Sequence, residues 1–336
     1  MPVLVTGAAG FLGSHVTDML LERGESVRVL VRPGERMPEE VRARVDVCMG
    51  DLADAGSLKA AVAGVDRVLH CAARTGPWGP RAEYDAANVQ GLQTLLNLSL
   101  NAGVQRFVHV SSITVHGNDV QGTADESSPL RLEPNPYSRS KVAGERLLDG
   151  LIRERHVPVS IVRPGWIYGP RDTGSFARFA RLLETGKMIM FGPGSNYLPL
   201  VHARDVAQGI LLASEAPQAV GRAYIIVNDE PVTQSDYLTA IARCLSVAPP
   251  TRHLPYRLAL LLATVAETGT RMTRRQGPPP VMRYGVQMLG GNNRFMIARA
   301  RQELGFVPRV ALAEGVEAST AWYKSIRDQQ GRRNSL

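Results

Sequence analysis

Short apolar runs alternate with longer amphipathic stretches through the first half of the chain. The apolar runs are rich in β-branched residues and span Val3–Thr6, Val27–Val31, Val45–Met49, Arg67–Cys71, Gln105–Val110 and Val159–Val162. Stretches with helical periodicity lie between them, among them Leu12–Arg23, Ala82–Ala102 and Ser138–Arg155. Near-continuous apolar strands separated by helices indicate a parallel sheet covered on both faces. The pattern therefore predicts a doubly wound α/β fold.

The pattern changes after about Pro164. Glycine and proline interrupt Gly165–Pro170 and Gly192–Pro199, and helices are expected at Ser235–Leu245, Pro255–Ala266 and Leu312–Arg327. We therefore expect a second, smaller and mostly C-terminal domain that holds a substrate. The first predicted domain comprises residues 1–164, with about 199–229 returning to it. The predicted substrate domain comprises about 165–198 and 230–330.

A glycine-rich segment, Thr6 to Gly13 (TGAAGFLG), follows the first strand directly and opens the first helix. Gly7 permits a tight turn, Gly10 lets the backbone approach a pyrophosphate, and Gly13 allows close helix–strand packing. Free N–H groups at the start of the helix, at Phe11 and Leu12, favour phosphate. The position predicts a Rossmann-type dinucleotide site; the alternative is a glycine-rich turn without a ligand.

The end of the second strand bears on the choice of cofactor. A site for NAD usually has a carboxylate there for the ribose 2′-hydroxyl, whereas this chain has Arg32. Because a guanidinium pairs with a 2′-phosphate, Arg32 favours NADP(H) over NAD(H). The alternative is that Arg32 stacks on adenine or points to solvent. Asp51 and Leu52, after the third strand, suit the edge of the adenine.

Tyr137 and Lys141 are spaced by four residues at the start of a helical run, so they share one face. A neighbouring ammonium is expected to lower the pKa of the phenol toward neutrality, which suits a general acid or base. Ser111 and Ser112 end the fifth strand, at the edge where such sheets bind ligands.

Together these motifs resemble the extended short-chain dehydrogenase/reductase family, almost from end to end. Further matching segments are His70–Ala73, Asn88–Gly91, Val110–Ser112 with Val115–Gly117, Arg163–Pro170, Val201–Asp205 and Ala300–Pro308. The resemblance implies a catalytic triad of Ser112, Tyr137 and Lys141. It also implies cofactor contacts at Cys71, Ala72, Ala73, Pro164 and Gly165, with Asn88 as a weaker candidate or an ordinary helix residue.

Departures from the family's motifs reduce the number of reactions that the sequence is expected to catalyse. Sugar-nucleotide dehydratases have Asp and Glu after the catalytic serine, where this chain has Ile113 and Thr114, and epimerases have a charged pair that residues 196–200 lack. Trp78, on a loop after the fourth strand, is either loop packing or one wall of an apolar slot, as in the 3β-hydroxysteroid-dehydrogenase-like branch. We therefore expect hydride transfer between the nicotinamide and a secondary alcohol or ketone of an apolar, steroid- or polyketide-like substrate. The alternatives are a nucleotide-sugar epimerase that holds NAD(P) tightly and a non-catalytic NADP(H) sensor, which the intact Ser112, Tyr137 and Lys141 disfavour.

Charge and composition add expectations about partners. The 336 residues carry a net charge of +8, and Arg252 to Arg309 contains ten arginines and two acids. That segment is either a solvated face or a site for an anionic substrate or an anionic membrane surface. The apolar stretch Leu254–Ala266 is either a core helix or a hydrophobic gate or membrane contact. No motif for nucleic acid or metal accompanies the charge.

Location and assembly complete the expectations. No apolar run approaches the ~18 residues of a membrane span, and three unpaired cysteines with no signal peptide favour a cytoplasmic protein. We expect a homodimer through helices 82–102 and 138–155, because these carry more leucines than one sheet face covers. The leucines concerned are Leu92, Leu95, Leu96, Leu147, Leu148 and Leu151.

Overall fold

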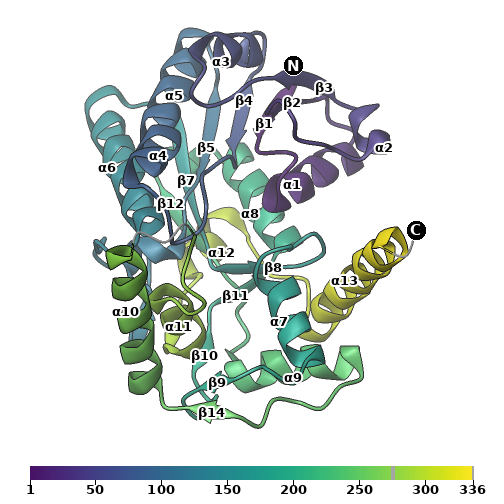
Figure 1. Cartoon of the computed structure of the whole chain (residues 1–336). Coiled ribbons are helices and arrows are strands. Elements are labelled where there is room, and N and C mark those ends of the chain that lie inside the picture. Colours follow the sequence, from purple (N-terminus) through teal and green to yellow (C-terminus); the bar gives the residue numbers. More distant parts are fainter. Residues whose placement is uncertain (274–276, 335–336) are drawn as a thin grey trace.

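Seven parallel strands form the central sheet of the computed structural model, which describes residues 1–273 and 277–334 (Figure 1). In sheet order the strands are β12 (Ala223–Ile226), β7 (Val159–Pro164), β5 (Arg106–Val110), β4 (Arg67–His70), β1 (Val3–Thr6), β2 (Val27–Val31) and β3 (Asp46–Met49). The strand order reverses at β1, whose neighbours are β2 and β4. The carboxyl ends of β1 and β4 therefore face the crevice where ligands of such sheets bind. The predicted Rossmann-type fold is confirmed.

Helices cover both faces of this sheet, as the apolar strands predicted. One face packs against α1 (Phe11–Glu22), α8 (Ala203–Glu215) and α12 (Ala298–Leu304). The other face packs against α3 (Ala55–Val62), α5 (Gly91–Asn101) and α6 (Pro136–Arg155). Short elements complete this half: α2 (Glu39–Arg42), α4 (Arg81–Asp85), a π-helical turn η1 (Ala86–Gln90) and two 3₁₀ turns, η2 (Ile113–His116) and η3 (Pro217–Ala219).

The leucines of α5 and α6 do not form the exposed surface that the sequence suggested. Leu92, Leu95, Leu96 and Leu148 are each 0% exposed and belong to the core between these helices, α3 and the sheet. Leu147 and Leu151 are half-buried. The interpretation of these residues as surplus apolar surface is therefore wrong, since α3 also packs on α5 and each helix buries more than one face. The homodimer stays a prediction without this support.

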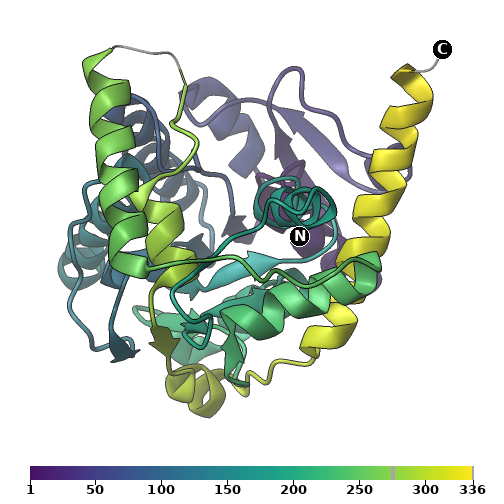
Figure 2. The ribbon, with the colours of Figure 1, turned by 60° about the horizontal axis from the view of Figure 1, so that its bottom comes forward.

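The remaining elements form a second lobe below the carboxyl edge of the sheet (Figures 1 and 2). Its helices are α7 (Ser175–Glu184), α9 (Gln234–Leu245), α10 (Tyr256–Met272), α11 (Arg283–Gly290) and α13 (Leu312–Asn334). Four small strand pairs join it: β6 (Gly122–Ala124) with β15 (Asn293–Phe295), β8 (Trp166–Tyr168) with β11 (Leu200–His202), β9 (Met190–Phe191) with β14 (His253–Leu254), and β10 (Tyr197–Leu198) with β13 (Val232–Thr233). The segment Ile297–Phe306, assigned to this lobe from the sequence, packs on the core of the first. The domain boundaries themselves stay predictions.

Helix α10 differs from the other helices of this lobe. Only Ala259, Ala263 and Glu267 are buried, whereas three of its leucines are exposed. The interpretation of this stretch as a core helix is therefore wrong for those leucines. Over residues 1–273 and 277–334 no helix combines the length and apolar character needed to cross a bilayer.

Candidate active site

One cavity of about 1390 Å³ runs from the glycine-rich loop after β1 to helices α7, α10 and α11. Every residue that the sequence singled out for the triad, the cofactor or the substrate lines it, except Asn88. These residues are Gly7, Gly10, Phe11, Leu12, Gly13, Arg32, Asp51, Leu52, Cys71, Ala72, Ala73, Trp78, Ser112, Tyr137, Lys141, Pro164 and Gly165. The fold thus brings together residues from the ends of six strands, β1 to β5 and β7, while the role of each stays a prediction.

The glycine loop packs so closely on neighbouring backbone that Gly7 and Gly13 have no space for a side chain. Gly7 has φ +72°, and a Cβ there would lie 2.9 Å from the backbone of Ala72. A Cβ at Gly13 would lie 2.1 Å from the carbonyl oxygen of Gly7. Helix α1 has no side-chain cap at Gly10 and no acidic residue in its first turn, so its first N–H groups are open to an anion. This cradle fits the pyrophosphate of a dinucleotide.

The end of β2 carries a charge pair rather than a free cation. Arg32 donates to Glu35 Oε1 from Nε at 3.0 Å and from Nη2 at 2.5 Å, and both residues line the cavity. The Arg32 side chain is largely exposed. Sequence reasoning missed Glu35, although it lies one turn beyond Arg32 and shares its loop. Nearby, the Asp51 carboxylate accepts a 2.9 Å hydrogen bond from the N–H of Ala53.

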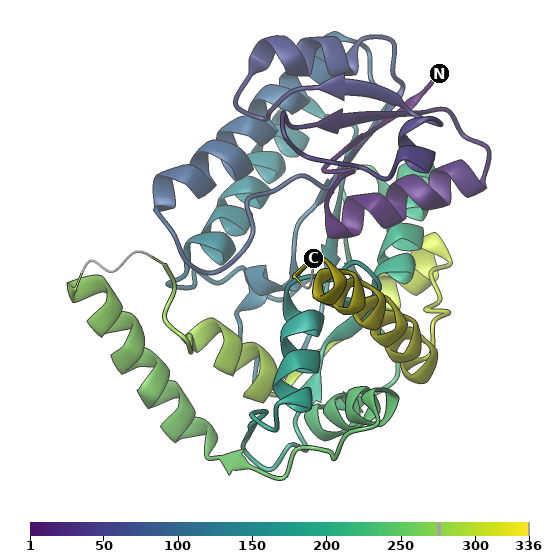
Figure 3. The ribbon, with the colours of Figure 1, turned by 45° about the vertical axis from the view of Figure 1, so that its right-hand side comes forward.

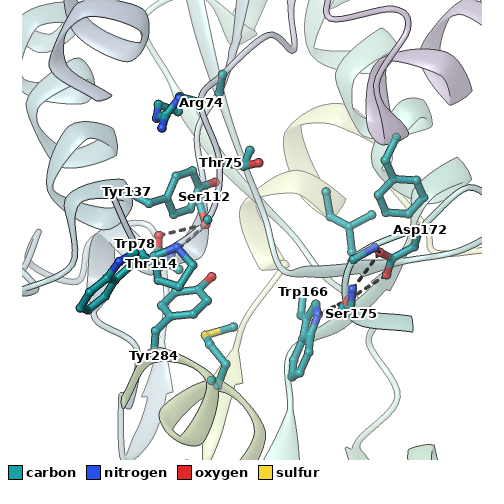
Figure 4. A pocket seen from close by; sticks show the side chains of 18 of the residues that line it. Arg74, Thr75, Trp78, Ser112, Thr114, Tyr137, Trp166, Asp172, Ser175 and Tyr284 are labelled. Atoms are coloured by element: carbon teal, nitrogen blue, oxygen red, sulfur yellow. Dashed lines mark hydrogen bonds between the residues drawn. The ribbon is translucent and has the colours of Figure 1, made fainter. Parts of the chain in front are cut away.

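Ser112 lies between Tyr137 and Thr114 at the end of β5 (Figure 4). Its hydroxyl oxygen accepts a hydrogen bond from the N–H of Thr114 at 3.2 Å and another from the Thr114 hydroxyl at 3.1 Å. The Tyr137 side chain lies beside it in the cavity (Figure 4). Burial raises the pKa of Tyr137 to about 12, and the influence of Ser112 opposes that rise. At neutral pH the phenol therefore keeps its proton.

Lys141 is 4% exposed, and its ammonium nitrogen lies 5.9 Å from the centre of the Tyr137 ring. It donates a 2.8 Å hydrogen bond to the carbonyl of Val110. Burial lowers the pKa of Lys141 to about 8, against the opposing influence of Glu145 and Cys71. The sequence-based expectation that Lys141 lowers the pKa of Tyr137 is wrong for this structure, because desolvation of the phenol dominates.

A buried ion pair supports the catalytic side of α6. The Glu145 carboxylate, one turn after Lys141, accepts from Arg163 Nη2 at 2.5 Å and from the Ser111 hydroxyl at 2.5 Å. Glu145 is 0% exposed and Arg163 is 5% exposed. The pair ties α6 to β7 and to the residue before Ser112. Sequence reasoning gave no role to Glu145.

Asn88 holds a loop rather than lining the cavity. From the π-helical turn η1, its side-chain oxygen accepts from the N–H of Arg74 at 2.7 Å and its amide donates to the Arg74 carbonyl at 2.9 Å. The same amide donates to the Ser140 hydroxyl at 2.8 Å. Tyr84 adds hydrogen bonds to the carbonyls of Gly76 at 2.8 Å and Trp78 at 2.9 Å. Asn88 and Tyr84 thus position the Trp78 loop beside the first turn of α6.

The far end of the cavity is mostly apolar, and the sequence predicted few of the residues that line it. Its walls come from β8, α7, α10 and α11 and the segments between them: Trp166, Phe179, Leu182, Met188, Phe191, Leu254, Leu262, Val281, Met282, Tyr284, Met288 and Leu289. Figure 4 shows Tyr284 beside Ser112 and Thr114, with Trp166 across the cavity. Burial raises the pKa of Tyr284, so it is also a protonated phenol. Trp166 lies in the matching segment Arg163–Pro170, and Leu254 and Leu262 lie in the stretch expected to form a core helix or a hydrophobic gate. No local motif marks the others, which reach the cavity only through packing.

The comparison with known families agrees with this geometry. The model of the NAD dependent epimerase/dehydratase family matches residues 3–227, which contain the glycine loop, Ser112, Tyr137 and Lys141. The chain belongs to this family. Its similarity to named enzymes spans nearly the whole chain, and the predicted membership of the extended short-chain dehydrogenases/reductases is confirmed.

Three similar proteins represent the family. The 2-alkyl-3-oxoalkanoate reductase of Shewanella oneidensis is 30% identical over 93% of this chain and 84% of its own length. The 3β-hydroxysteroid dehydrogenase/Δ5→4-isomerase of Mycobacterium tuberculosis is 31% identical over 97% of this chain and 91% of its own length. The crystal structure of DesIV, a dTDP-glucose 4,6-dehydratase from Streptomyces venezuelae with NAD bound, has a TM-score of 0.78 and 27% identity, covering 98% of both chains. The family therefore uses a nicotinamide cofactor, and this chain is an NAD(P)-dependent oxidoreductase.

Proposed function

We propose that the protein transfers hydride between a nicotinamide cofactor and a secondary alcohol or ketone on an apolar substrate. The observation that carries this proposal is the meeting of two features in one cavity. A protonated phenol beside a serine hydroxyl lies where the glycine-rich half of the cavity ends, and an apolar chamber begins beside it. A bound NAD(P)H supplies the hydride.

In the proposed mechanism Tyr137 and Ser112 bind the oxygen of the reacting carbonyl. Tyr137 gives its proton to that oxygen during reduction and recovers it during oxidation. The Ser112 hydroxyl, already oriented by Thr114, holds the same oxygen in place. Lys141, as an ammonium, would bind the nicotinamide ribose and so hold the cofactor beside Tyr137.

The apolar chamber supports a steroid- or polyketide-like substrate. Aromatic and aliphatic side chains dominate its walls, and such walls bind ligands mainly through removal of apolar surface from water. Two relatives act on substrates of this kind by their names, an alkyl oxoalkanoate and a hydroxysteroid. Trp78 and Tyr284 then contact the substrate next to the reacting carbon.

Nucleotide-sugar epimerisation is the second candidate function, favoured by one observation. Arg178 and Lys187 line the substrate end and supply cations for a diphosphate. Against it, Arg178 already donates a 2.8 Å hydrogen bond to the carbonyl of Pro280, and the surrounding wall is apolar.

A ketone panel with two tyrosine variants tests the proposal. Wild-type protein should consume NADPH in step with an apolar ketone, and Tyr137→Phe should lower kcat by about 10²–10⁴-fold while cofactor binding persists. Tyr284→Phe is the matched control: it removes a second phenol from the same cavity and should change kcat by less than about tenfold. Epimerisation of a UDP-sugar without net consumption of cofactor would establish the second candidate instead. Full activity of Tyr137→Phe would refute the triad.

We also propose a preference for NADP(H), in which Arg32 leaves Glu35 to pair with the 2′-phosphate. Arg32→Asp should then weaken NADPH binding relative to NADH. Glu35→Gln should strengthen NADPH binding, because it removes the competing partner and a repulsive charge. Fluorescence titration of both cofactors against the three proteins decides the question. Equal affinities of the wild-type protein for NADPH and NADH would refute the preference.

A further inference from the structure

Helix α10 exposes a continuous apolar stripe at the edge of the molecule. We use "the α10 stripe" for Leu258, Leu261, Leu262, Val265 and Met272, which recur at helical spacing and are 43%, 58%, 50%, 62% and 80% exposed. The opposite face of the helix packs on α11 through Ala259 and Ala263. Figure 3 shows α10 at the periphery, with α11 on its inner side. Large apolar side chains clustered in this way mark an interaction surface.

Positive charges predominate around the α10 stripe. Arg257 and Arg271 are exposed on the helix, and Arg252 is exposed just before it. Between Asp236 and Glu303 the sequence has a single acid, Glu267. That carboxylate is 8% exposed and is paired with Arg283 at 3.0 Å, so it does not offset the arginines. Asp119, which accepts a 2.5 Å hydrogen bond from the Tyr256 hydroxyl, is an acid at the start of the helix. An apolar stripe flanked mainly by cations is complementary to an anionic interface.

The α10 stripe is continuous with the apolar end of the cavity. Leu262 belongs to the stripe and also lines the cavity, as does Val281, which is likewise exposed. At the other end of the helix, the Arg271 guanidinium lies 5.4 Å from the centre of the Trp78 ring, which places α10 against the Trp78 loop. An apolar path therefore leads from the exposed helix face into the chamber.

We propose that α10 docks the protein on the surface of an anionic lipid bilayer, with the α10 stripe in the boundary between headgroups and acyl chains. The length and composition of α10 suit a helix that lies in the interface rather than one that spans it. The orientation turns the opening of the cavity toward the bilayer. Delivery of an apolar substrate along this path rests on the proposed function, whereas the docking does not.

A second copy of the chain fits the α10 stripe less well than a bilayer. A symmetric pair of α10 helices would bring Arg257 and Arg271 of one protomer close to the same residues of the other. Like charges at such an interface oppose association. Anionic headgroups, in contrast, are attracted by each arginine near the surface.

Vesicle flotation of the full-length protein tests the docking without any substrate. The probes are phosphatidylcholine vesicles with and without roughly one third phosphatidylglycerol. Wild-type protein should float with the anionic vesicles, and Leu261→Asp with Val265→Asp should lower the partition coefficient by at least about tenfold. The matched control is Leu132→Asp with Met296→Asp, two residues that are 52% and 50% exposed and lie outside the cavity. This control should float like wild type.

The charges are tested separately. Arg252→Gln with Arg257→Gln should lower binding to anionic vesicles by about fivefold for each arginine, with no effect on neutral vesicles. Cofactor binding by every variant shows that the fold is intact. The proposal is overturned if wild-type protein does not float, or if both aspartate pairs lose binding equally. It is also overturned if light scattering shows a dimer that Leu261→Asp with Val265→Asp dissociates, because the α10 stripe then belongs to a second copy.

Discussion

The two ends of the cavity differ in whether main chain or side chains form the wall. At the cofactor end the wall is mostly main chain, where Gly7, Gly13 and the start of α1 approach each other so closely that one added methyl group would overlap a backbone atom. At the substrate end the wall consists of side chains from β8, α7, α10 and α11, and no single residue fixes its shape. At the cofactor end, steric overlap allows only glycine at fixed positions. At the substrate end, a residue is restricted only in its volume and polarity.

The two ends of the cavity also differ in their charged groups. The cofactor end has the uncapped start of α1, which favours a phosphorylated ligand, together with the ammonium of Lys141 and the ion pair between Arg32 and Glu35. The substrate end offers mainly apolar surface, with Tyr284 as a polar group beside the triad. Changes at the cofactor end should therefore have large and specific effects on cofactor binding. Changes at the substrate end should have graded effects on the substrate alone.

The largest effect is expected from Gly13→Ala. A Cβ at this position would lie 2.1 Å from the carbonyl oxygen of Gly7, so the loop and α1 have to separate. Overpacking of this kind costs about 1–3 kcal/mol, and the displaced N–H groups no longer converge on a phosphate. NADPH affinity should fall on the order of 100-fold, as measured by titration of the purified protein.

Gly150→Ala provides the control for that substitution. Gly150 lies in α6 with no atom within 4 Å of an added Cβ, so alanine should raise helix stability slightly and leave NADPH affinity unchanged. If Gly13→Ala binds NADPH within about twofold of wild type, the steric account of the cofactor end is wrong.

The same division explains what the sequence could predict. TGAAGFLG predicted the loop after β1 because close backbone approach requires glycine at fixed positions, and the spacing of Tyr137 and Lys141 placed them on one face of α6. Tyr284 and Phe179 had no comparable signal. They reach the cavity from α11 and α7 through long-range packing, and an aromatic residue in an amphipathic helix more often packs in the core than lines a binding site.

Helix faces were the least predictable feature, for a related reason. The leucines of α5 exceeded what the sheet alone covers, but α3 packs on the same helix and buries Leu92, Leu95 and Leu96. In α10 the reverse holds, since α11 covers only its small residues and leaves Leu261 exposed. Both faces have leucines at helical spacing, and only the position of a neighbouring helix distinguishes them.

The second-largest effect is expected in the pH dependence of NADPH binding, which we attribute to Lys141. Its pKa of about 8 means that the ammonium, which we propose binds the ribose, is present at neutral pH and lost as the pH rises above that value. NADPH binding should therefore weaken by about tenfold between about pH 7 and pH 9, because one hydrogen bond to a charged group is lost. Lys141→Met should bind NADPH about tenfold more weakly at neutral pH and show no further weakening over that range.

Stability provides an independent measurement for Lys141. Because burial places its folded pKa below the unfolded value of 10.5, the unfolded chain binds more protons between about pH 8 and that value. The free energy of unfolding of the wild-type protein should therefore rise with pH across this window, relative to Lys141→Met. Denaturant titrations of both proteins at several pH values measure the difference. A constant difference would show that Lys141 is not desolvated in the folded state.

The smallest effect is expected at the substrate end, from Leu182→Ala. Leu182 is half-buried on α7 and lines the apolar chamber, so its truncation removes contact with the substrate but no backbone support. The KM for an apolar ketone should rise by about 3- to 10-fold, with kcat and NADPH affinity unchanged. Leu98→Ala, a half-buried leucine on α5 outside the cavity, should carry a similar stability cost and leave KM unchanged. If Leu182→Ala weakens NADPH binding as strongly as it raises KM, the two ends of the cavity are coupled, and the separation between a main-chain end and a side-chain end fails.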